Sequence, residues 1–191
     1  MHKKLLEIIV EESTRLADIV NDLLLASQLD ADRLEMRCRA VRCARTRCQR
    51  ARRRAHAPAR RVAESVSTPD MRTFRRSVAD EGQLRQVLAN LIDNAVKYSP
   101  DGGDVRVRLS LQGRHVRFTV ADEGLGIPPA EQSRIFEKFY RVDPDMAGGI
   151  GGTGLGLYIS RELVRRVHGR IWVEANQGRG SVFHVEIPAA L

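Results

Sequence analysis

The stretch from Asp80 to Ser99 constrains the fold of this chain more than any other, because it has the full pattern of an amphipathic helix. Asp80 is the predicted N-cap, with Gln83 as its capping-box partner. Pro100 ends the helix, since the residue before a proline avoids the α region. Apolar residues recur at helical spacing and predict one buried stripe, formed by Leu84, Val87, Leu88, Leu91, Ile92 and Ala95.

A second face of the same predicted helix is polar. Asn90, Asn94 and Lys97 fall within roughly 60° of one another when each residue turns the helix by about 100°. An amide oxygen is a ligand for Mg²⁺, and a lysine ammonium pairs with phosphate oxygens, so this face suits a triphosphate. The alternative interpretation is an ordinary solvated face, and this helix alone does not decide between the two.

Residues 1–36 predict a separate helix with the seam of a helix bundle. The seam positions step alternately by four and three residues, with one polar interruption: Leu5, Ile9, Glu12, Leu16, Ile19, Leu23 and Ala26. Ile8, Val20 and Leu24 widen this stripe, which favours a bundle over a two-stranded coiled coil. One helix cannot bury such a face alone, so we expect a partner helix. The alternative is that the helix docks back onto the main domain.

Residues 37–73 differ from the rest of the chain in composition. Eleven arginines and no acidic residue lie between 37 and 61, and the whole chain has a formal charge of +8, so 8 − 11 leaves about −3 elsewhere. This tract has few large apolar side chains to offset its ordering entropy. We therefore expect an arginine-rich linker without regular structure, or an aberrant stretch such as an out-of-frame translation.

The same tract gives little sign of a metal or nucleic-acid site. All three cysteines lie in it, and their spacing matches neither a zinc site nor a disulfide framework. No aromatic residue is interleaved between 37 and 61 for base stacking, so no nucleic-acid partner is expected. The whole chain lacks a signal-peptide pattern and a run of about 18 apolar residues. We expect no membrane segment in it and a cytoplasmic location.

The part that follows the central helix alternates with the period of β-strands. Val105–Leu111 and Val116–Val120 predict a hairpin that turns at Gly113, and Ile171–Glu174 and Val182–Ile187 predict a closing hairpin. Between the two hairpins, Pro128 and Pro129 open a predicted short helix with three apolar residues on one side, namely Ile135, Phe136 and Phe139.

One more helix is predicted between the hairpins, from Leu155 to His168, with Gly169 at its C-cap. Its apolar positions are Ile159, Leu163, Val164 and Val167. Helices and strands in this order indicate a layer of helices on one mixed sheet, with the other face of the sheet more open.

Four motifs occur along the chain in a fixed order: N-L-I-D-N-A-V-K-Y at 90–98, D-E-G-L-G-I at 122–127, F-E-K-F-Y-R at 136–141 and G-T-G-L-G-L at 152–157. Together they resemble the N, G1, F and G2 boxes of the sensor histidine kinases of two-component systems, which belong to the GHKL ATPases. The resemblance implies the Bergerat (GHKL) fold, a two-layer α/β (α+β) sandwich, for the catalytic domain at 74–191. Residues 1–36 resemble the second helix of the dimerisation and histidine-phosphotransfer hairpin.

The resemblance also implies a role for each motif in binding ATP and Mg²⁺. Asp122 would accept a hydrogen bond from the adenine amino group, Asn94 would ligate Mg²⁺, and Lys97 would contact phosphate. Asn90 stands where other GHKL proteins have a glutamate base that activates water, and an asparagine is no such base.

The remaining roles come from the same resemblance. Arg141 would stabilise charge on the γ-phosphate, and residues 142–151 would form the ATP lid. The implied ATP-binding residues are Asn90, Asn94, Lys97, Tyr98, Asp122, Gly124, Gly126, Ile127, Tyr140, Gly152, Thr153, Gly154, Leu155, Gly156 and Leu157. The implied catalytic residues are Asn90, Lys97 and Arg141.

The chain departs from the family in lacking a phosphoacceptor motif. None of its five histidines lies in an H-E-x-x-T-P-like context. We therefore expect a kinase domain that phosphorylates a histidine supplied in trans, with a response regulator as partner. The helix over Leu5–Ala26 would join a homodimer or another kinase. The alternatives are a nucleotide-binding module that docks to another kinase, and a GHKL-type serine kinase or ATPase.

Overall fold

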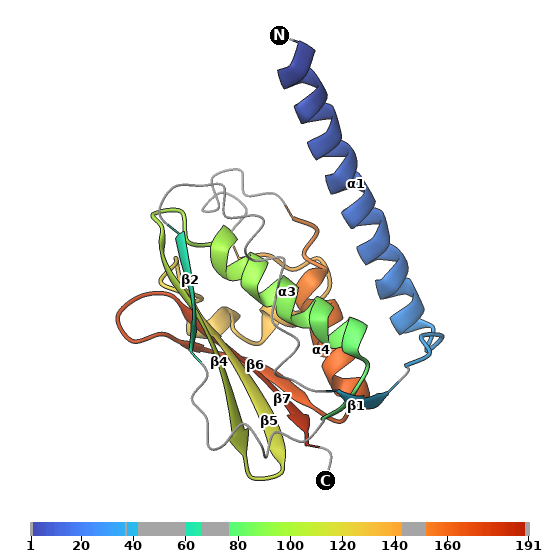
Figure 1. The fold of residues 1–191 in the computed structure, drawn as a ribbon, viewed down its shortest axis with the longest axis vertical. Coiled ribbons are helices and arrows are strands. Elements are labelled where there is room, and N and C mark those ends of the chain that lie inside the picture. The colour runs from blue at the N-terminus through green and yellow to red at the C-terminus, as the bar shows by residue number, and fades with distance from the viewer. Residues whose placement is uncertain (1, 37, 42–59, 66–76, 143–151, 190–191) are drawn as a thin grey trace.

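The computed structural model describes residues 2–36, 38–41, 60–65, 77–142 and 152–189. Helices α3 (Glu81–Lys97) and α4 (Gly156–Arg166) cover one face of a sheet. The long helix α1 (His2–Asp30) meets the domain near its C-terminal end and projects away from it toward the N-terminus (Figure 1). The predicted two-layer sandwich with an N-terminal helix is confirmed.

The main sheet has five strands and mixed topology. In spatial order they are β2 (Arg60–Ser65), β4 (Gly103–Gln112), β5 (His115–Ala121), β7 (Ser181–Pro188) and β6 (Arg170–Ala175). β2 runs parallel to β4, whereas every other neighbouring pair is antiparallel. Both predicted hairpins, β4–β5 and β6–β7, are confirmed. A second small sheet pairs β1 (Arg39–Val41) with β3 (Ser77–Ala79).

The core lies between the helices and the inner face of the sheet. All six residues of the predicted stripe on α3 are buried, and Leu91 has no exposed surface. Alternate residues of the strands meet them: Val105, Leu109, Val116, Phe118, Val120, Phe183, Val185 and Ile187. A fully buried leucine or valine contributes about 1.5–3 kcal/mol relative to an exposed one. This packing fixes which face of α3 is left for a ligand.

Asp80 caps α3 as predicted, but its expected partner does not reciprocate. The Asp80 carboxylate accepts hydrogen bonds from the backbone N–H groups of Gly82 and Gln83, at 2.9 and 3.2 Å. Among the described residues, Oε1 of Gln83 is buried and has no hydrogen-bond partner. The capping box predicted from the sequence is therefore half-formed, with Asp80 alone satisfying the helix N-terminus.

Phe139 does not share the buried side of its segment, which corrects the prediction. The predicted short helix is a pair of 3₁₀ turns, η2 (Pro129–Glu131) and η3 (Arg134–Phe136). Ile135 and Phe136 are buried, whereas Phe139 is 62% exposed and has a φ of 62°. A left-handed backbone conformation breaks helical periodicity, so the side chain no longer follows the apolar pattern.

The chain turns at the end of α4 through His168, whereas the prediction gave this role to Gly169. His168 has a φ of 56°, and the N–H of Gly169 donates to the Val164 carbonyl at 2.9 Å. Gly169 is needed for a different reason, because a Cβ there would lie 2.4 Å from the Glu186 carbonyl oxygen. The glycine thus allows close approach of α4 to β7, and the histidine takes the left-handed position.

Two strands fall inside the tract for which no regular structure was expected. β1 lies at one end of the 37–73 tract, and β2 pairs in parallel register with β4 from Arg60–Gly103 to Ser65–Arg108. The prediction is wrong for these two segments, because backbone hydrogen bonds to a neighbouring strand need no large apolar side chains. The rest of the linker, at 42–59 and 66–73, lies outside the described residues, as does most of the predicted lid.

Part of the predicted seam of helix α1 packs on the domain, and the rest is exposed. Ala26 and Leu29 are buried against the domain, and Ile19 is partly buried. Much of the predicted seam is exposed, together with its flanking residues: Leu5, Leu6, Ile8, Ile9, Val10, Leu16, Val20, Leu23 and Leu24. Docking on the main domain therefore accounts for the C-terminal end of α1 and leaves its larger apolar face open. No helix in the described part of the chain is long and apolar enough to cross a membrane.

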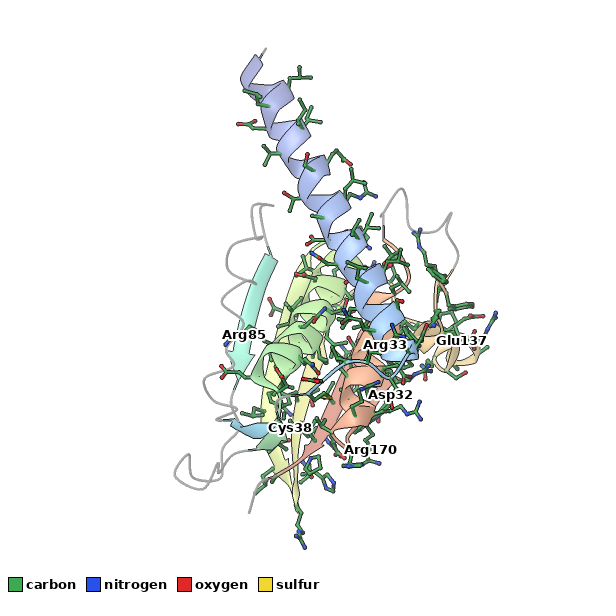
Figure 2. The ribbon with its side chains drawn as sticks, turned by 90° about the vertical axis from the view of Figure 1, so that its right-hand side faces the viewer. Asp32, Arg33, Cys38, Arg85, Glu137 and Arg170 are labelled. Carbon is green, nitrogen blue, oxygen red and sulfur yellow. The ribbon has the colours of Figure 1, made fainter. Side chains whose placement is uncertain are left out.

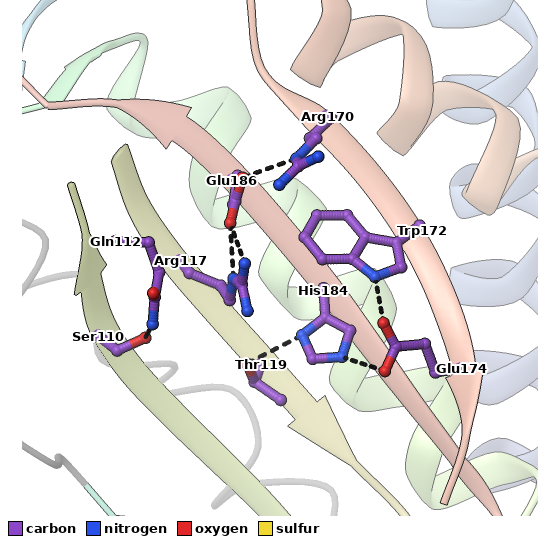
Figure 3. A network of polar contacts seen from close by, with 9 residues as sticks. All are labelled: Ser110, Gln112, Arg117, Thr119, Arg170, Trp172, Glu174, His184 and Glu186. Carbon is purple, nitrogen blue, oxygen red and sulfur yellow. Dashed lines mark hydrogen bonds and ion pairs between the residues drawn. The ribbon is translucent and has the colours of Figure 1, made fainter. Parts of the chain in front are cut away.

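The outer face of the sheet is polar and held by a connected network (Figure 3). The Glu186 side chain, only 5% exposed, accepts hydrogen bonds from Arg117 and Arg170 at 2.6 and 2.7 Å. The Trp172 indole stacks on the His184 ring, with centroids 4.8 Å apart. This network satisfies the Glu186 carboxylate, which would otherwise be costly to bury. The face that carries it is opposite the one that α3 and α4 cover, and it is the more open face, as predicted.

Candidate nucleotide-binding site

A cavity of about 830 Å³ lies along the polar face of α3. It gathers fourteen of the residues that the sequence proposed: Asn90, Asn94, Lys97, Tyr98, Asp122, Gly126, Ile127, Tyr140, Arg141, Gly152, Thr153, Gly154, Gly156 and Leu157. Gly124 and Leu155 do not line it. Leu155 is buried in the core. Gly124 contacts a lining residue, since its N–H donates to the Asp122 carboxylate.

Asp122 is the buried acceptor in this cavity. It follows β5 and is 4% exposed, and its Oδ1 accepts hydrogen bonds from the N–H groups of Gly124 at 2.9 Å and Ser181 at 3.1 Å. Burial raises the pKa of the Asp122 carboxyl, and these two N–H bonds oppose that shift. Both bonds go to one oxygen, so the other is the natural acceptor for a ligand.

Two positions beside Asp122 favour glycine for different reasons, close backbone approach at Gly124 and a positive φ at Gly126. A Cβ at Gly124 would lie 2.2 Å from the Tyr98 carbonyl oxygen, which accepts a hydrogen bond from the Leu125 N–H at 3.0 Å. Gly126 has a φ of 76°, a conformation that favours glycine. The segment after β5 is therefore pressed onto the C-terminal end of α3, which brings Asp122 and the polar face of α3 into one cavity.

The polar face of α3 supplies the cationic and amide groups. The Asn90 side-chain amide donates to the Ser160 hydroxyl of α4 at 2.9 Å, and a Cβ at Gly156 would lie 2.3 Å from Asn90 Oδ1. The pKa of the Lys97 ammonium is lowered by burial and by the neighbouring charges of Arg141 and Arg15. An anionic ligand placed near these cations would be stabilised by their charges.

The glycine-rich segment enters α4 directly beside these groups. Gly154 has a φ of 70°, and its carbonyl accepts the Phe139 N–H at 3.1 Å, while the Thr153 hydroxyl accepts the Leu155 N–H at 3.2 Å. A Cβ at Gly152 would lie 2.6 Å from the Lys97 ammonium. The start of α4 and Lys97 thus face the same part of the cavity, where helix N–H groups favour an anion.

Tyr140 and Arg141 close the side of the cavity that follows η3. The Tyr140 hydroxyl donates to the Glu131 carboxylate, and the Arg134 guanidinium lies 4.3 Å from the Tyr140 ring centroid. Arg141 lines the cavity, and its positive charge lowers the pKa of Lys97. These contacts hold the aromatic ring as part of the wall.

The structure adds two groups of lining residues that sequence reasoning missed. The turn between β6 and β7 contributes Asn176 and Arg179, whose side chains donate to the carbonyls of Asp122 and Gly124 at 2.7 and 3.2 Å. Helix α1 contributes Arg15, Asp18, Ile19 and Asp22. The glycines of the turn were read only as a hairpin signal, and nothing in the α1 pattern indicated a polar ligand-facing side.

Comparison with known proteins identifies the fold and the site together. Residues 79–191 match the family described as histidine kinase-, DNA gyrase B-, and HSP90-like ATPases. The chain belongs to this family. The sequence-based resemblance is confirmed. All four motifs lie within the matched residues, and residues of each motif line the cavity.

The similar proteins are sensor histidine kinases. The chain is 35% identical over 187 residues to the sensor-like histidine kinase SenX3 of Mycolicibacterium smegmatis, covering 97% of this chain and 48% of that protein. It is 32% identical to the sensor histidine kinase WalK of Bacillus subtilis, covering 93% of this chain and 29% of WalK. Full-length ShkA in complex with AMPPNP superimposes with a TM-score of 0.79 at 36% identity, covering 94% of this chain and 37% of ShkA. This chain thus spans about half or less of the length of these relatives.

Proposed function

We propose that this chain binds ATP with Mg²⁺ and transfers the γ-phosphate to a histidine supplied in trans, as the catalytic part of a two-component sensor histidine kinase. One observation carries the proposal: a single cavity unites a buried carboxylate with a free acceptor face, an amide and an ammonium on one helix face, and the glycine-rich start of α4. The carboxylate suits the purine amino group, the amide and the ammonium suit a metal-bound triphosphate, and the start of α4 suits phosphate oxygens.

The residues divide naturally along the cavity. Asp122 would accept from the adenine amino group, with Ile127, Tyr98 and Tyr140 as walls around the base. Lys97 and Arg141 would balance phosphate charge, and the backbone from Gly152 to Leu157 would present N–H groups to phosphate oxygens. These assignments match the roles that the family resemblance implies for the same positions.

Asn94 is the residue that would hold Mg²⁺. It lines the cavity one helical turn from Asn90 and within one turn of Lys97. A magnesium ion bound to a nucleotide uses few protein ligands, because phosphates and water fill most of its coordination positions. A single amide oxygen beside the cationic groups therefore fits the ion, which would offset the charge of the phosphates when bound.

Phosphoryl transfer is favoured over ATP hydrolysis by the position of Asn90. Its amide is hydrogen-bonded to Ser160 between α3 and α4, and an amide cannot accept a proton from water as a carboxylate base would. The curated relatives described above are named as kinases that act through histidine, which disfavours the alternatives of a serine kinase, an ATPase or a nucleotide-binding module without kinase activity.

The partners of this activity follow from α1 and from the family. The exposed apolar face of α1 would pair with a second copy of this chain or with another kinase. The phosphorylated histidine would then supply a response regulator, in a cytoplasmic signalling pathway. No nucleic-acid partner is proposed.

Isothermal titration with AMPPNP tests the proposal. The wild-type chain should bind AMPPNP, and Mg²⁺ should increase its affinity. Asn94→Ala should remove most of the Mg²⁺-dependent gain and keep binding measured in EDTA. Asn21→Ala, the same change at an exposed position on α1, is the matched control and should behave like wild type. Failure of the wild-type chain to bind AMPPNP would reject the nucleotide site.

A further inference from the structure

Helix α1 contributes a polar side to the cavity, which is unexpected for a helix whose sequence pattern indicates dimerisation. Arg15, Asp18, Ile19 and Asp22 recur at helical spacing and line the cavity together with residues of α3 and of the segment after η3. The same face continues to Ala26 and Leu29, which are buried against the domain. The packing of these two residues therefore holds the polar side over the cavity.

Arg15 is the cation of this side, and it lies within electrostatic reach of Lys97. Besides burial, the neighbouring positive charges of Arg141 and Arg15 lower the pKa of the Lys97 ammonium. Arg15 forms an ion pair with Glu12 at 3.8 Å, and the two side chains are 54% and 58% exposed. An exposed pair at this distance contributes little to stability, so the Arg15 side chain can turn toward a stronger anion.

Three cations from three separate elements line the cavity, and the charges of two of them, Arg141 and Arg15, act on the third, Lys97. Lys97 comes from α3, Arg141 from the segment after η3, and Arg15 from α1. A phosphate group bound near all three would be stabilised by each of these charges. A guanidinium suits phosphate oxygens, because its N–H groups form a planar fork that bonds two of them.

We propose that Arg15 binds the terminal phosphate of the nucleotide, so that α1 completes the triphosphate end of the site. This inference rests on the nucleotide-binding function proposed above. It assigns to α1 a direct contact with the substrate in addition to pairing between helices. The contact makes triphosphate affinity depend on a residue outside the region that matches the ATPase family, 79–191.

The acidic residues on the same side limit this effect and sharpen the prediction. Asp18 and Asp22 also line the cavity, and burial together with the charge of Asp18 raises the pKa of the Asp22 carboxyl. Asp93 of α3 faces the cavity as well. Because the net charge of the α1 side is not positive, only a direct contact between Arg15 and a phosphate group would favour the triphosphate over the diphosphate.

Titration of matched variants with AMPPNP–Mg²⁺ and ADP–Mg²⁺ tests the proposal. Arg15→Ala should weaken AMPPNP binding by about three- to tenfold, the range for one partly exposed charged hydrogen bond. ADP, which lacks the terminal phosphate, should bind as it does to wild type. Arg33→Ala is the control, because it removes the same charge from an exposed residue just beyond the C-terminal end of α1 (Figure 2). Arg15→Lys should keep part of the preference, since it retains the charge without the planar fork.

The outcomes separate this inference from the proposed function. If wild type binds neither nucleotide, the nucleotide site itself is wrong. If wild type binds both and Arg15→Ala binds AMPPNP equally well, the assignment of Arg15 is overturned. Equal loss for AMPPNP and ADP would also overturn it, because that result indicates a structural role. Circular dichroism and the unfolding temperature of each variant show whether α1 and the domain remain folded.

Discussion

At the scale of single residues, the Asp122 carboxylate combines a structural and a binding role through its two oxygens. Oδ1 accepts the N–H groups of Gly124 and Ser181, and so ties the end of β5 to the start of β7. The backbone of Asp122 adds to the same connection, since its N–H donates to the Ser181 carbonyl at 2.9 Å. The other oxygen, Oδ2, accepts neither of these bonds, so a substitution can change the binding role and keep the structural one.

Asp122→Asn should keep the fold and lose the nucleotide. An asparagine oxygen can still accept both N–H bonds, but an NH₂ group then replaces the oxygen that would face the adenine amino group. Two donors would oppose each other, and we expect AMPPNP affinity to fall by at least about tenfold, the cost of one unsatisfied buried group. Titration calorimetry measures the loss, and the unfolding temperature checks the fold. Asp104→Asn, outside the cavity, is the control; tight binding by Asp122→Asn would reject the role of Asp122.

His184 should make the stability of the domain depend on pH (Figure 3). Its Nδ1 lies 3.2 Å from the Thr119 hydroxyl, and its Nε2 lies 3.6 Å from Glu174, too far for a hydrogen bond. Burial is the main cause that lowers the pKa of His184, so the folded state binds a proton less readily than the unfolded state. The free energy of unfolding should therefore fall as the pH drops through the pKa of an unfolded histidine, about 6.5.

Thermal unfolding at pH 7.5 and pH 5.5 tests this dependence. The wild-type protein should lose more of its unfolding temperature over this interval than His184→Gln, which retains a partner for Thr119 and does not titrate. His115→Gln changes an exposed histidine and should lose as much as wild type. Identical losses in wild type and His184→Gln would show that another group dominates.

At the scale of elements, the junction between α1 and α4 is fastened by polar contacts around the end of α1. The Tyr158 hydroxyl donates to Asp30 at 2.6 Å, and Lys138 forms an ion pair with the same carboxylate. The Arg166 guanidinium donates to the carbonyls of Leu29 and Leu34 at 3.2 and 3.1 Å. These carbonyls lie at and beyond the end of α1, where the helix itself offers no donors.

Arg166→Ala should loosen α1 without unfolding the domain. The substitution leaves the Leu34 carbonyl without its donor, leaves the Leu29 carbonyl only the Asp32 N–H at 3.3 Å, and removes the 2.6 Å ion pair with Asp32. We expect about 1–2 kcal/mol less local stability, seen as faster hydrogen exchange over residues 25–35 and unchanged exchange in β5 and β7. Arg165→Ala is the control, because Arg165 forms an ion pair with Glu162 on its own helix. Equal protection in Arg166→Ala and wild type would show that Ala26 and Leu29 suffice to hold α1.

The sequence predicted the elements whose signals are local and missed features that depend on tertiary contacts. The stripe on α3 and most of the alternation in β4 and β5 were correct, because burial there follows one periodicity, but Leu111 near the end of β4 is exposed. Asn176 reaches the Asp122 carbonyl only through the pairing of β7 with β5, and no spacing along the chain reveals that. The sequence leaves the docking of α1 open as an alternative, because a 3.5-residue seam shows which residues need cover and not whether a partner helix or the domain supplies it; two seam residues, Ile19 and Ala26, pack on the domain. Phe139 obeyed the apolar pattern and was mispredicted, since backbone conformation there overrides periodicity.

At the scale of the whole molecule, the exposed apolar face of α1 predicts self-association. Nine large apolar side chains on it are at least half exposed, a large patch for a soluble surface. The face lies beyond the docked end of the helix and projects from the domain (Figure 1). The wild-type chain should therefore be dimeric in analytical ultracentrifugation at micromolar concentration. Leu16→Glu together with Leu23→Glu should give monomers, whereas Leu111→Glu, at an exposed position on β4, should not. A wild-type monomer at all concentrations would contradict self-association.

The last prediction concerns phosphoryl transfer by this 191-residue polypeptide. Incubated with ATP and Mg²⁺, it should not accumulate acid-labile phosphohistidine, because transfer requires an acceptor held in line with the γ-phosphate. His184 is buried on the outer face of the sheet, and His115 lies on the neighbouring strand β5, two strands from the sheet edge that carries β6. His168 follows α4, His2 begins α1, and His56 lies outside the described residues.

A complete dimerisation hairpin from a related kinase should restore transfer, since α1 offers an open face to receive it. Labelling with [γ-³²P]ATP, with and without the hairpin, measures both outcomes. Asn94→Ala should abolish labelling of the added hairpin, and a hairpin lacking its histidine should remain unlabelled. Strong labelling of the lone chain that disappears on substitution of one of its own histidines would overturn the requirement for an acceptor in trans. That result would also identify the acceptor as a histidine that the structure does not place near the cavity.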